Sequence, residues 1–234
     1  MALTGLCRGA LGVDPVPTEY HWMAPAGAAL LGYLLGSIPF GLILTRLFGA
    51  GDLRQIGSGN IGATNVLRTG RKGLAAATLL LDAAKGFAAV WLAQHVFSAH
   101  DASLGVIAGA AAFLGHVYPI WLRFRGGKGV ATLMGIILAL HWPCALVYAV
   151  VWLGLLALLR ISSVAGMAAA VSAPVSAAFF SAFDIVLLLL ALALLVLWKH
   201  RENIDRLLSG TEPRIGGKKA TAPSDAPEVP DADV

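Results

Sequence analysis

Seven long apolar segments constrain this chain more than any other feature of its sequence. A helix needs about 20 predominantly apolar residues to cross the hydrocarbon core of a bilayer, and most of the segments approach that length. Backbone groups inside a bilayer must bond within their own helix, so runs of this kind are typical of membrane helices. The sequence therefore predicts an all-α, polytopic membrane protein. The segments are 24–48, 73–97, 103–122, 129–141, 142–159, 162–181 and 183–199.

The composition agrees with a membrane protein and argues against a soluble domain. Hydrophobic residues make up 58% of the chain and charged residues only 13%, whereas about 25% of an average soluble domain is charged. The two cysteines, Cys7 and Cys144, are too few for a disulfide framework and stand in no metal-ligand spacing. We therefore predict no metal site and no cofactor, and we expect no nucleic-acid partner.

The distribution of Lys and Arg predicts the orientation of the segments. With seven spans, the loops 49–72 and 123–128, Arg160 and the C-terminal tail lie on one face, which carries or borders fifteen of the seventeen basic residues. Cytoplasmic loops are enriched in these residues. The alternative, one kinked helix over 129–159, leaves six spans and moves Arg160 and the tail to the other face. We therefore predict seven transmembrane helices, with the N-terminus outside and the C-terminus in the cytoplasm.

Three parts of the chain are expected. Residues 1–22 form an N-terminal extension that lacks the charged start and continuous apolar run of a signal peptide. Met23 directly precedes the first segment and is a second candidate for the translation start. Residues 23–216 form the membrane domain. Residues 217–234 are rich in Pro, Ala and Asp, a composition typical of disorder.

The loop after the first segment has the composition of a phosphate site. It reads DLRQIGSGNIGATNVLRTGRKG over residues 52–73. Glycine lets backbone N–H groups approach an anion closely, and the hydroxyl of Ser58 and the guanidinium of Arg68 would complete the site. We also expect a helix from Val66 on, with its N-terminus toward the anion.

Two other interpretations of this loop remain open. It is compatible with a flexible connector whose basic residues lie at the lipid surface. Its glycines at 57, 59 and 62 also match the dinucleotide pattern GxGxxG. That pattern acts within a βαβ unit, whereas the loop here is flanked by membrane segments.

A second glycine-rich motif lies between the third and fourth segments and reads GHVYPIWLRFRGGKGVAT over residues 115–132. Lys128 between glycines is a point charge on bare backbone, which suits phosphate. Arg123 and Arg125 are equally compatible with a role as anchors to lipid headgroups. His116 is compatible with a histidine that is hydrogen-bonded within the bundle. The motif fails the Walker pattern, because Leu122 stands where its first glycine should be.

The start of the tail predicts a short amphipathic helix at the membrane surface. It reads KHRENIDRLLSGTEPRIG over residues 199–216, and places His200 and Asn203 near the membrane face. His200 and Asp205 also spell HxxxxD, the acyltransferase motif of a different class. So loose a pattern often matches by chance.

Two charged residues, Asp82 and Lys85, lie inside the second segment. At a spacing of three residues they share a helix face and can pair. Charges inside a membrane are costly and are usually paired or functional, so a structural ion pair and a contribution to the site both remain open. The stretch Ser37-Ile38-Pro39 interrupts the first segment, and it predicts either a broken helix beside a polar cavity or a plain proline kink.

With these motifs in place, the chain resembles the acyl-phosphate-dependent glycerol-3-phosphate acyltransferases of bacterial membranes over about residues 28–216. Several long motifs in the same order make the resemblance specific. Ile61 departs from it slightly, because this variable position is often proline in the family. The motifs are GSIPFG at 36–41, SGNIGATNVLR at 58–68, DAAKG at 82–86, GHVYPIWLRFRGGKG at 115–129 and HRENIDRL at 200–207.

The resemblance implies transfer of a fatty acyl group from acyl phosphate to the 1-hydroxyl of sn-glycerol 3-phosphate, giving lysophosphatidic acid and phosphate. Acyl-CoA and acyl carrier protein are not direct donors. It also implies a seven-helix fold in the inner membrane with its active site facing the cytoplasm, and we expect a monomer among membrane lipids. By resemblance, Ser58, Arg68, Lys128, His200 and Asn203 hold glycerol 3-phosphate, and Gly62, Ala63, Thr64 and Gly127 shape a hole for the donor's phosphate.

Arg68, Lys128 and His200 are the residues expected to act on the reacting groups. Cations stabilise the charge that develops on the carbonyl oxygen and the leaving phosphate. The general base remains open between His200, whose imidazole titrates near neutral pH, and the donor's own phosphate. The main rival from another class is a transporter for phosphorylated molecules, which should show repeat symmetry and polar groups near the midplane. The sequence has no such repeat, and its polar motifs cluster at one face. A non-catalytic scaffold would have no use for three glycine-flanked basic motifs.

Overall fold

The protein folds into a bundle of helices. The computed structural model describes residues 22–97 and 102–216, and every regular element in these stretches is helical, which confirms the predicted all-α class. The predicted terminal regions, 1–21 and 217–234, lie outside the described residues, as does the question of the translation start. The elements are α1 (Met23–Gly36), α2 (Phe40–Leu47), η2 (Leu53–Gln55), α3 (Ala63–Leu67), α4 (Lys72–Val96), α5 (Ala102–Val117), η3 (Ile120–Leu122), α6 (Val130–Leu140), α7 (Trp142–Leu159), α8 (Ser162–Phe179), α9 (Phe183–Lys199) and α10 (Arg201–Leu208).

Five helical segments are long and apolar enough to cross a membrane. They are α1 with α2, α4, α5 with η3, α7 and α8. The pair α9 and α10, bent by 56°, gives a sixth. The apolar helix α6 has only 11 residues, so at 1.5 Å per residue it spans about 16 Å, roughly half of a bilayer core. Each predicted segment ends within two residues of the corresponding helix or helix pair.

Residues 129–159 form two helices rather than one kinked helix. His141 between them is extended, with φ −158° and ψ 92°, and its Nδ1 accepts a hydrogen bond from the backbone N–H of Cys144 at 3.4 Å. Helices α6 and α7 then pack against each other, so the chain reverses between them.

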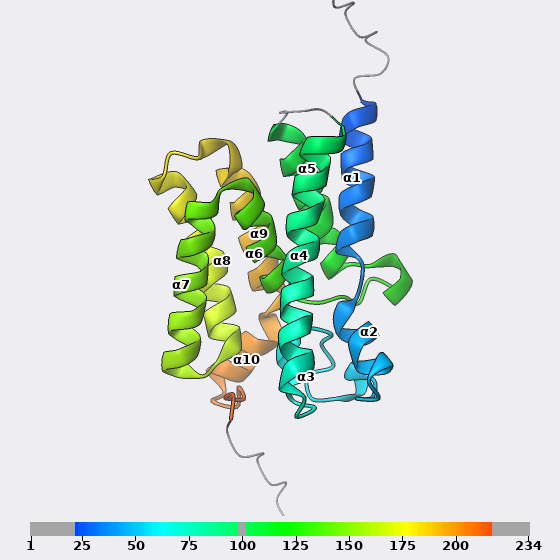
Figure 1. Ribbon diagram of the computed structural model, residues 1–234. Helices are drawn as coiled ribbons and strands as arrows, with labels where there is room; N and C mark the ends of the chain where they lie inside the picture. Colours follow the sequence, from blue (N-terminus) through cyan, green and yellow to red (C-terminus); the bar gives the residue numbers. More distant parts are fainter. Residues whose placement is uncertain (1–21, 98–101, 217–234) are drawn as a thin grey trace, which may run out of the picture.

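The helices form two groups joined by α6 (Figure 1). Helices α1, α4 and α5 pack together on one side, α7, α8 and α9 pack together on the other, and α6 lies against α4. Small residues allow the close approaches, because a Cβ at Gly36 would overlap the carbonyl of Ala112 in α5, and one at Gly135 would overlap the carbonyl of Ala83 in α4. The largest apolar core lies among α4 to α9.

The first segment is broken rather than merely kinked. Between α1 and α2, the stretch Ser37–Pro39 leaves carbonyls without helical partners. Lys85 of α4 donates from Nζ to the carbonyl of Ile38 at 2.7 Å, and Trp121 of η3 donates from its indole N–H to the carbonyl of Ser37 at 2.8 Å. Irregular backbone at membrane depth is tolerated where protein groups satisfy it in this way.

The predicted polar motifs gather at one end of the bundle. Helix α3, the start of α4, the turn between α7 and α8, and α10 all lie at the lower end in Figure 1. The connection between α8 and α9 and the end of α4 lie at the opposite end. The elements that carry the candidate site residues are therefore neighbours in space.

Candidate active site

Asn65 organises the first glycine-rich loop from its centre. Its side-chain Nδ2 lies 2.8 to 2.9 Å from the carbonyl oxygens of Leu53, Ile56 and Asn60. Its Oδ1 accepts a bond from the backbone N–H of Ser58 at 3.3 Å. Asn65 is buried, so these bonds lie away from water. One amide thus fixes the path of the loop, which argues against the flexible connector.

The loop ends in a helix that starts earlier than the sequence predicts. Helix α3 begins at Ala63, not at Val66, and α4 begins separately at Lys72. The helix starts here because Asn60 turns the chain, its Oδ1 accepting from the backbone N–H of Gly62 at 2.9 Å. No strand adjoins the loop within the described residues, so the dinucleotide interpretation has no βαβ unit.

The second glycine-rich motif wraps around the C-terminal end of α5. Backbone N–H groups of Gly126 and Gly127 donate to the carbonyls of Val117 at 3.1 Å and His116 at 3.0 Å. A Cβ at Gly127 would overlap the imidazole of His116, and Gly129 adopts φ +88°, which favours glycine. Packing against α5 therefore requires glycines here, and the turn presents Lys128 at the cavity.

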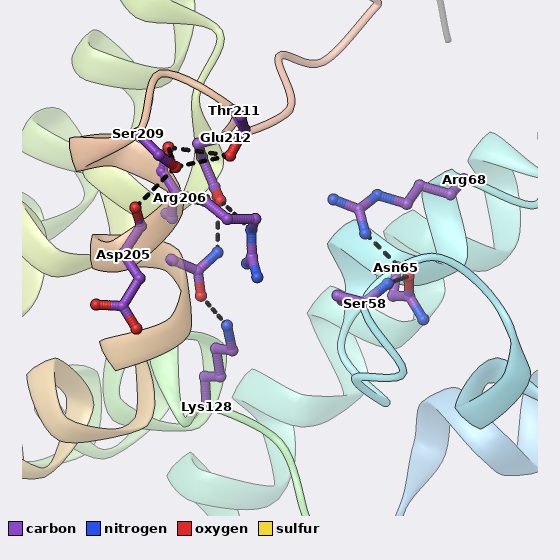
Figure 2. A network of polar contacts seen from close by, with 11 residues as sticks. Ser58, Asn65, Arg68, Lys128, Asp205, Arg206, Ser209, Thr211 and Glu212 are labelled. Atoms are coloured by element: carbon purple, nitrogen blue, oxygen red, sulfur yellow. Dashed lines mark hydrogen bonds and ion pairs between the residues drawn. The ribbon is translucent and has the colours of Figure 1, made fainter. Parts of the chain in front are cut away.

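A polar network joins this turn to the C-terminal segment (Figure 2). Lys128 donates from Nζ to Oδ1 of Asn203 in α10. Asn203 donates from Nδ2 to Oε1 of Glu212 at 2.6 Å. The same carboxylate accepts from Ser163 at 2.7 Å and from Nε of Arg206 at 2.8 Å. The backbone N–H of Ile215 donates to the carbonyl of Arg160 at 2.7 Å, which ties the segment to the turn before α8.

These elements enclose one polar cavity of about 110 Å³. Figure 2 shows Lys128 and Arg206 on one side of an open space, with Ser58 and Arg68 on the other. All the predicted site residues except Gly127 line the cavity, and Gly127 packs beneath its wall against His116. The predicted residues in the lining are Ser58, Gly62, Ala63, Thr64, Arg68, Lys128, His200 and Asn203.

The surroundings of the cavity set its charges. Burial and, to a smaller extent, the nearby positive charge of Arg206 lower the pKa of Lys128 to about 8. Burial also acts to raise the pKa of Glu212, but hydrogen bonds from Ser163, Asn203 and Arg206 outweigh it and hold that pKa below its usual value. Near neutral pH the site therefore holds an ammonium and a carboxylate, with the guanidinium of Arg68 facing them.

His200 enters the cavity as a neutral imidazole. Its Nδ1 lies 2.8 Å from the carbonyl oxygen of Val196, so Nδ1 carries the proton and Nε2 keeps a free lone pair. Burial lowers its pKa to about 4, which makes it a weaker base than the sequence suggests. Asp205 is exposed and does not line the cavity, so the HxxxxD pattern forms no His–Asp pair.

A second cavity, almost entirely apolar and about 430 Å³ in volume, adjoins the first. It runs between α4, α6 and α7. Four residues, Leu79, Val130, Ala131 and Trp152, line both cavities. The site thus offers a charged chamber that continues into an apolar groove, which suits a ligand with a phosphate head and a hydrocarbon tail. Among the residues described, no three His, Cys, Asp or Glu side chains come together as a metal site.

The comparisons with known proteins agree with this geometry. Residues 26–210 match the family described as glycerol-3-phosphate acyltransferase. The chain belongs to this family. A glycerol-3-phosphate acyltransferase of Novosphingobium aromaticivorans is 66% identical over 190 residues, covering 81% of this chain and 94% of that protein. One of Caulobacter vibrioides is 55% identical over 208 residues, covering 88% of this chain and 94% of that protein.

Two solved structures of the family share the fold. Both are crystal structures of PlsY (YgiH), an integral membrane glycerol 3-phosphate acyltransferase, and both are 38% identical to this chain. The glycerol 3-phosphate form superposes with a TM-score of 0.76 and the lysophosphatidic acid form with 0.74. Each comparison covers 82% of this chain and 96% of the other. The resemblance drawn from the motifs is thereby confirmed at the level of the family.

Two residues of the cavity, Glu212 and Ser163, carry no prediction from the sequence, whereas Asp82 and His116 were left open between a structural role and the site. Glu212 and Ser163 belong to the network around Lys128, and Asp82 and His116 line the cavity floor. Glu212 carried one signal, since within residues 209–216 it is the only acidic residue and stands two residues before the only basic one, Arg214. Ser163 carried none, because it lies in an apolar segment that packing alone brings to the site.

Proposed function

We propose that this protein transfers a fatty acyl group from acyl phosphate to the 1-hydroxyl of sn-glycerol 3-phosphate. The observation that carries the proposal is the continuity of the charged cavity with the apolar groove through four shared wall residues. The hydroxyl oxygen attacks the acyl carbonyl carbon and forms the ester bond. The bond between that carbon and the phosphate oxygen breaks. The hydroxyl proton leaves with the phosphate, so the products are lysophosphatidic acid and hydrogen phosphate.

The acceptor would bind in the charged cavity. Lys128 and Arg68 face each other across it, and each offers positive charge to the acceptor's phosphate. Ser58 and Asn203 supply neutral hydrogen-bonding groups to the glycerol hydroxyls, and Nε2 of His200 supplies an acceptor. Binding both reactants in one chamber supplies much of the rate by orientation alone.

The donor would lie with its tail in the apolar groove and its phosphate at the start of α3. Gly62, Ala63 and Thr64 line the charged cavity there, and early backbone N–H groups of a helix have no helical partner. Gly127 would act indirectly, because its lack of a side chain allows the 126–129 turn to pack against α5. The groove between α4, α6 and α7 has more than three times the volume of the charged cavity, as a long acyl chain requires.

The donor's phosphate, rather than His200, would take the hydroxyl proton. An imidazole with a pKa of about 4 is a poor base near neutral pH. The second pKa of a phosphate monoester lies near 6, so the departing phosphate is the better proton acceptor. His200 would then orient the acceptor hydroxyl through Nε2, while Arg68 and Lys128 stabilise the developing negative charge.

The proposed topology is seven crossings in the inner membrane, with the N-terminus outside and the site facing the cytoplasm. The basic loops adjoin the cavity at one end of the bundle, which is the cytoplasmic end by the positive-inside rule. Helix α6 would complete its crossing with the extended turn that precedes it. One chain supplies every wall of the cavity, so we propose a monomer whose membrane domain covers residues 23–216.

The experiment supplies purified protein with palmitoyl phosphate and sn-glycerol 3-phosphate and measures phosphate release and lysophosphatidic acid. We expect both products, with an absolute need for the acceptor, and their loss in Lys128→Ala. Palmitoyl-CoA and palmitoyl-acyl carrier protein serve as alternative donors and should give no product. Transfer from palmitoyl-CoA alone would overturn the proposed donor. Uptake of labelled glycerol 3-phosphate into sealed vesicles without any acyl transfer would instead indicate a transporter.

A further inference from the structure

Three buried polar side chains lie beneath the charged cavity and have no part in the proposed transfer. They are Asp82 and Lys85 of α4 and His116 of α5, whose relative exposures are 4%, 5% and 5%. Lys85 Nζ lies 2.7 Å from Oδ1 of Asp82, so the two residues form the ion pair that their spacing in the sequence allows. Asp82 and His116 also line the floor of the charged cavity, so the ion pair of Asp82 and Lys85 adjoins the site. Polar groups in an apolar bundle are costly and call for a reason.

His116 is in contact with the turn that carries Lys128. Its carbonyl accepts the backbone N–H of Gly127 at 3.0 Å, and its imidazole Nε2 leaves no room for a side chain on Gly127. Lys128 is the next residue. Any rotation of the imidazole therefore moves the backbone from which the Lys128 ammonium projects into the cavity.

Asp82 faces the other side of the same ring. Its Oδ1 lies 3.7 Å from Nδ1 of His116, and Nδ1 has no hydrogen-bond partner within the described part of the chain. Lys85 holds Asp82 and donates to the carbonyl of Ile38 in the break of the first segment. A continuous line of contacts thus runs from the break, through the ion pair and the imidazole, to the turn.

We propose that Asp82 and His116 are positioning residues. They fix the position of the 126–129 turn and, through it, the distance between the Lys128 ammonium and the acceptor's phosphate. The inference rests on the proposed function, because glycerol 3-phosphate is the ligand that Lys128 would meet. Lys85 acts one step further out, as the partner that holds the carboxylate of Asp82 in place at 2.7 Å. All three side chains are buried, and packed supporting residues are what a site needs to hold a charge in productive geometry.

The first test compares two substitutions of His116. His116→Leu keeps bulk against Gly127 but offers no polar atom to Asp82, whereas His116→Asn keeps a polar atom near the Nδ1 position. We expect the KM for glycerol 3-phosphate to rise about 10- to 100-fold in His116→Leu, as for a small misplacement of a binding group. His116→Asn should recover part of that loss. The KM for palmitoyl phosphate should stay unchanged in both.

The second test separates positioning from simple charge balance. Asp82→Asn alone leaves the buried charge of Lys85 unpaired, which is strongly destabilising, so Asp82→Asn/Lys85→Met removes both charges at similar volume. We expect this double variant to fold, with a melting transition lowered only by the loss of the Lys85 bond to the carbonyl of Ile38, and still to show the raised KM for glycerol 3-phosphate. Thr132→Val is the matched control, since it removes another buried polar group near α4 that does not line the cavity.

The outcomes distinguish the two proposals. If the wild-type protein shows no acyl transfer, the proposed function is wrong, whatever the variants show. If the wild-type protein transfers the acyl group and the double variant keeps the wild-type KM for glycerol 3-phosphate, the positioning role is overturned. Asp82 and Lys85 are then only a stabilising pair. If the double variant does not fold, the His116 variants decide alone: wild-type KM in His116→Leu overturns the inference.

Discussion

Lys128 donates a hydrogen bond to the side-chain oxygen of Asn203, 75 residues further along the chain, and so joins the glycine-rich turn before α6 to helix α10. Asn203 in turn donates to Glu212. The amide therefore stands between an ammonium and a carboxylate that attract each other. It keeps the ammonium available to a ligand instead of letting it pair with the acid.

Asn203→Ala should release Lys128 toward Glu212. The ammonium would then form an ion pair with the carboxylate and be less available to the acceptor's phosphate. We expect the KM for glycerol 3-phosphate to rise about tenfold, which corresponds to the loss of one charge-assisted hydrogen bond. The KM for palmitoyl phosphate should not change. Steady-state kinetics with each substrate varied in turn measures both. Arg201→Ala, at an exposed residue of the same helix outside the cavity, is the control and should match wild type.

The pKa of Lys128 predicts how acceptor affinity depends on pH. Burial lowers this pKa to about 8, so the ammonium is present below pH 8 and is lost above it. Because phosphate binding needs the charged form, kcat/KM for glycerol 3-phosphate should fall above about pH 8 with a slope of about −1. Lys128→Arg should remove this limb, because a guanidinium stays charged above pH 12. An identical alkaline limb in both proteins would assign it to another group.

His200→Ala should slow the enzyme without abolishing its activity. The imidazole is neutral at working pH and offers one lone pair to the acceptor hydroxyl, so its loss should lower kcat about tenfold, the worth of one hydrogen bond. A group with a pKa of about 4 does not titrate near neutral pH, so the pH profile of His200→Ala near neutral pH should keep the wild-type shape. A folded His200→Ala protein that binds glycerol 3-phosphate but shows no turnover would make His200 the general base.

Local sequence patterns predicted the helices well, because each depends on the polarity of its own residues. The seven apolar runs gave helix boundaries within two residues, and the Ser37-Ile38-Pro39 stretch gave the break in the first segment. The start of α3 at Ala63 was missed, since it depends on the turn that the side chain of Asn60 makes. Helix α6 shows the limit of hydropathy as a criterion, because an apolar segment that was predicted to span the membrane forms a helix of only 11 residues.

The candidate site was predictable where its residues lie in dense motifs and hidden where packing alone assembles it. Lys128 and Arg68 stand out among glycines in loops. Ser163 reaches the cavity only because α8 packs beside α7 and α9. The same holds for His116, which is a plain buried histidine by sequence and becomes a support for Gly127 through the path of the turn. The apolar groove could not be predicted at all, since three helices share it.

Asn65→Leu should loosen the first glycine-rich loop while sparing the bundle. The substitution removes the amide that bonds three carbonyls, and each buried carbonyl left unpaired costs about 1 to 3 kcal/mol. We expect faster amide hydrogen exchange over residues 53–62 and at least a tenfold loss of kcat/KM. Thr69→Val removes a side-chain bond of the same loop that stays within one helical turn, and it should leave both quantities unchanged.

Filling the apolar groove should discriminate among donors by chain length. Ala149 of α7 lines the groove about one turn beyond Trp152, which borders both cavities. Ala149→Phe should exclude the outer part of a long acyl chain. Each buried methylene contributes about 0.8 kcal/mol, so excluding two raises the KM for palmitoyl phosphate about 15-fold.

A short donor such as octanoyl phosphate should be affected less, because its chain ends nearer the charged cavity, and the KM for glycerol 3-phosphate should not move. Val150→Phe places the same ring on the neighbouring residue, which is 62% exposed on the outside of α7 and does not line the groove. It should behave as wild type with every donor. Equal losses for octanoyl and palmitoyl phosphate in Ala149→Phe would place the acyl chain elsewhere on the protein, because a groove that holds the tail must distinguish the two by length.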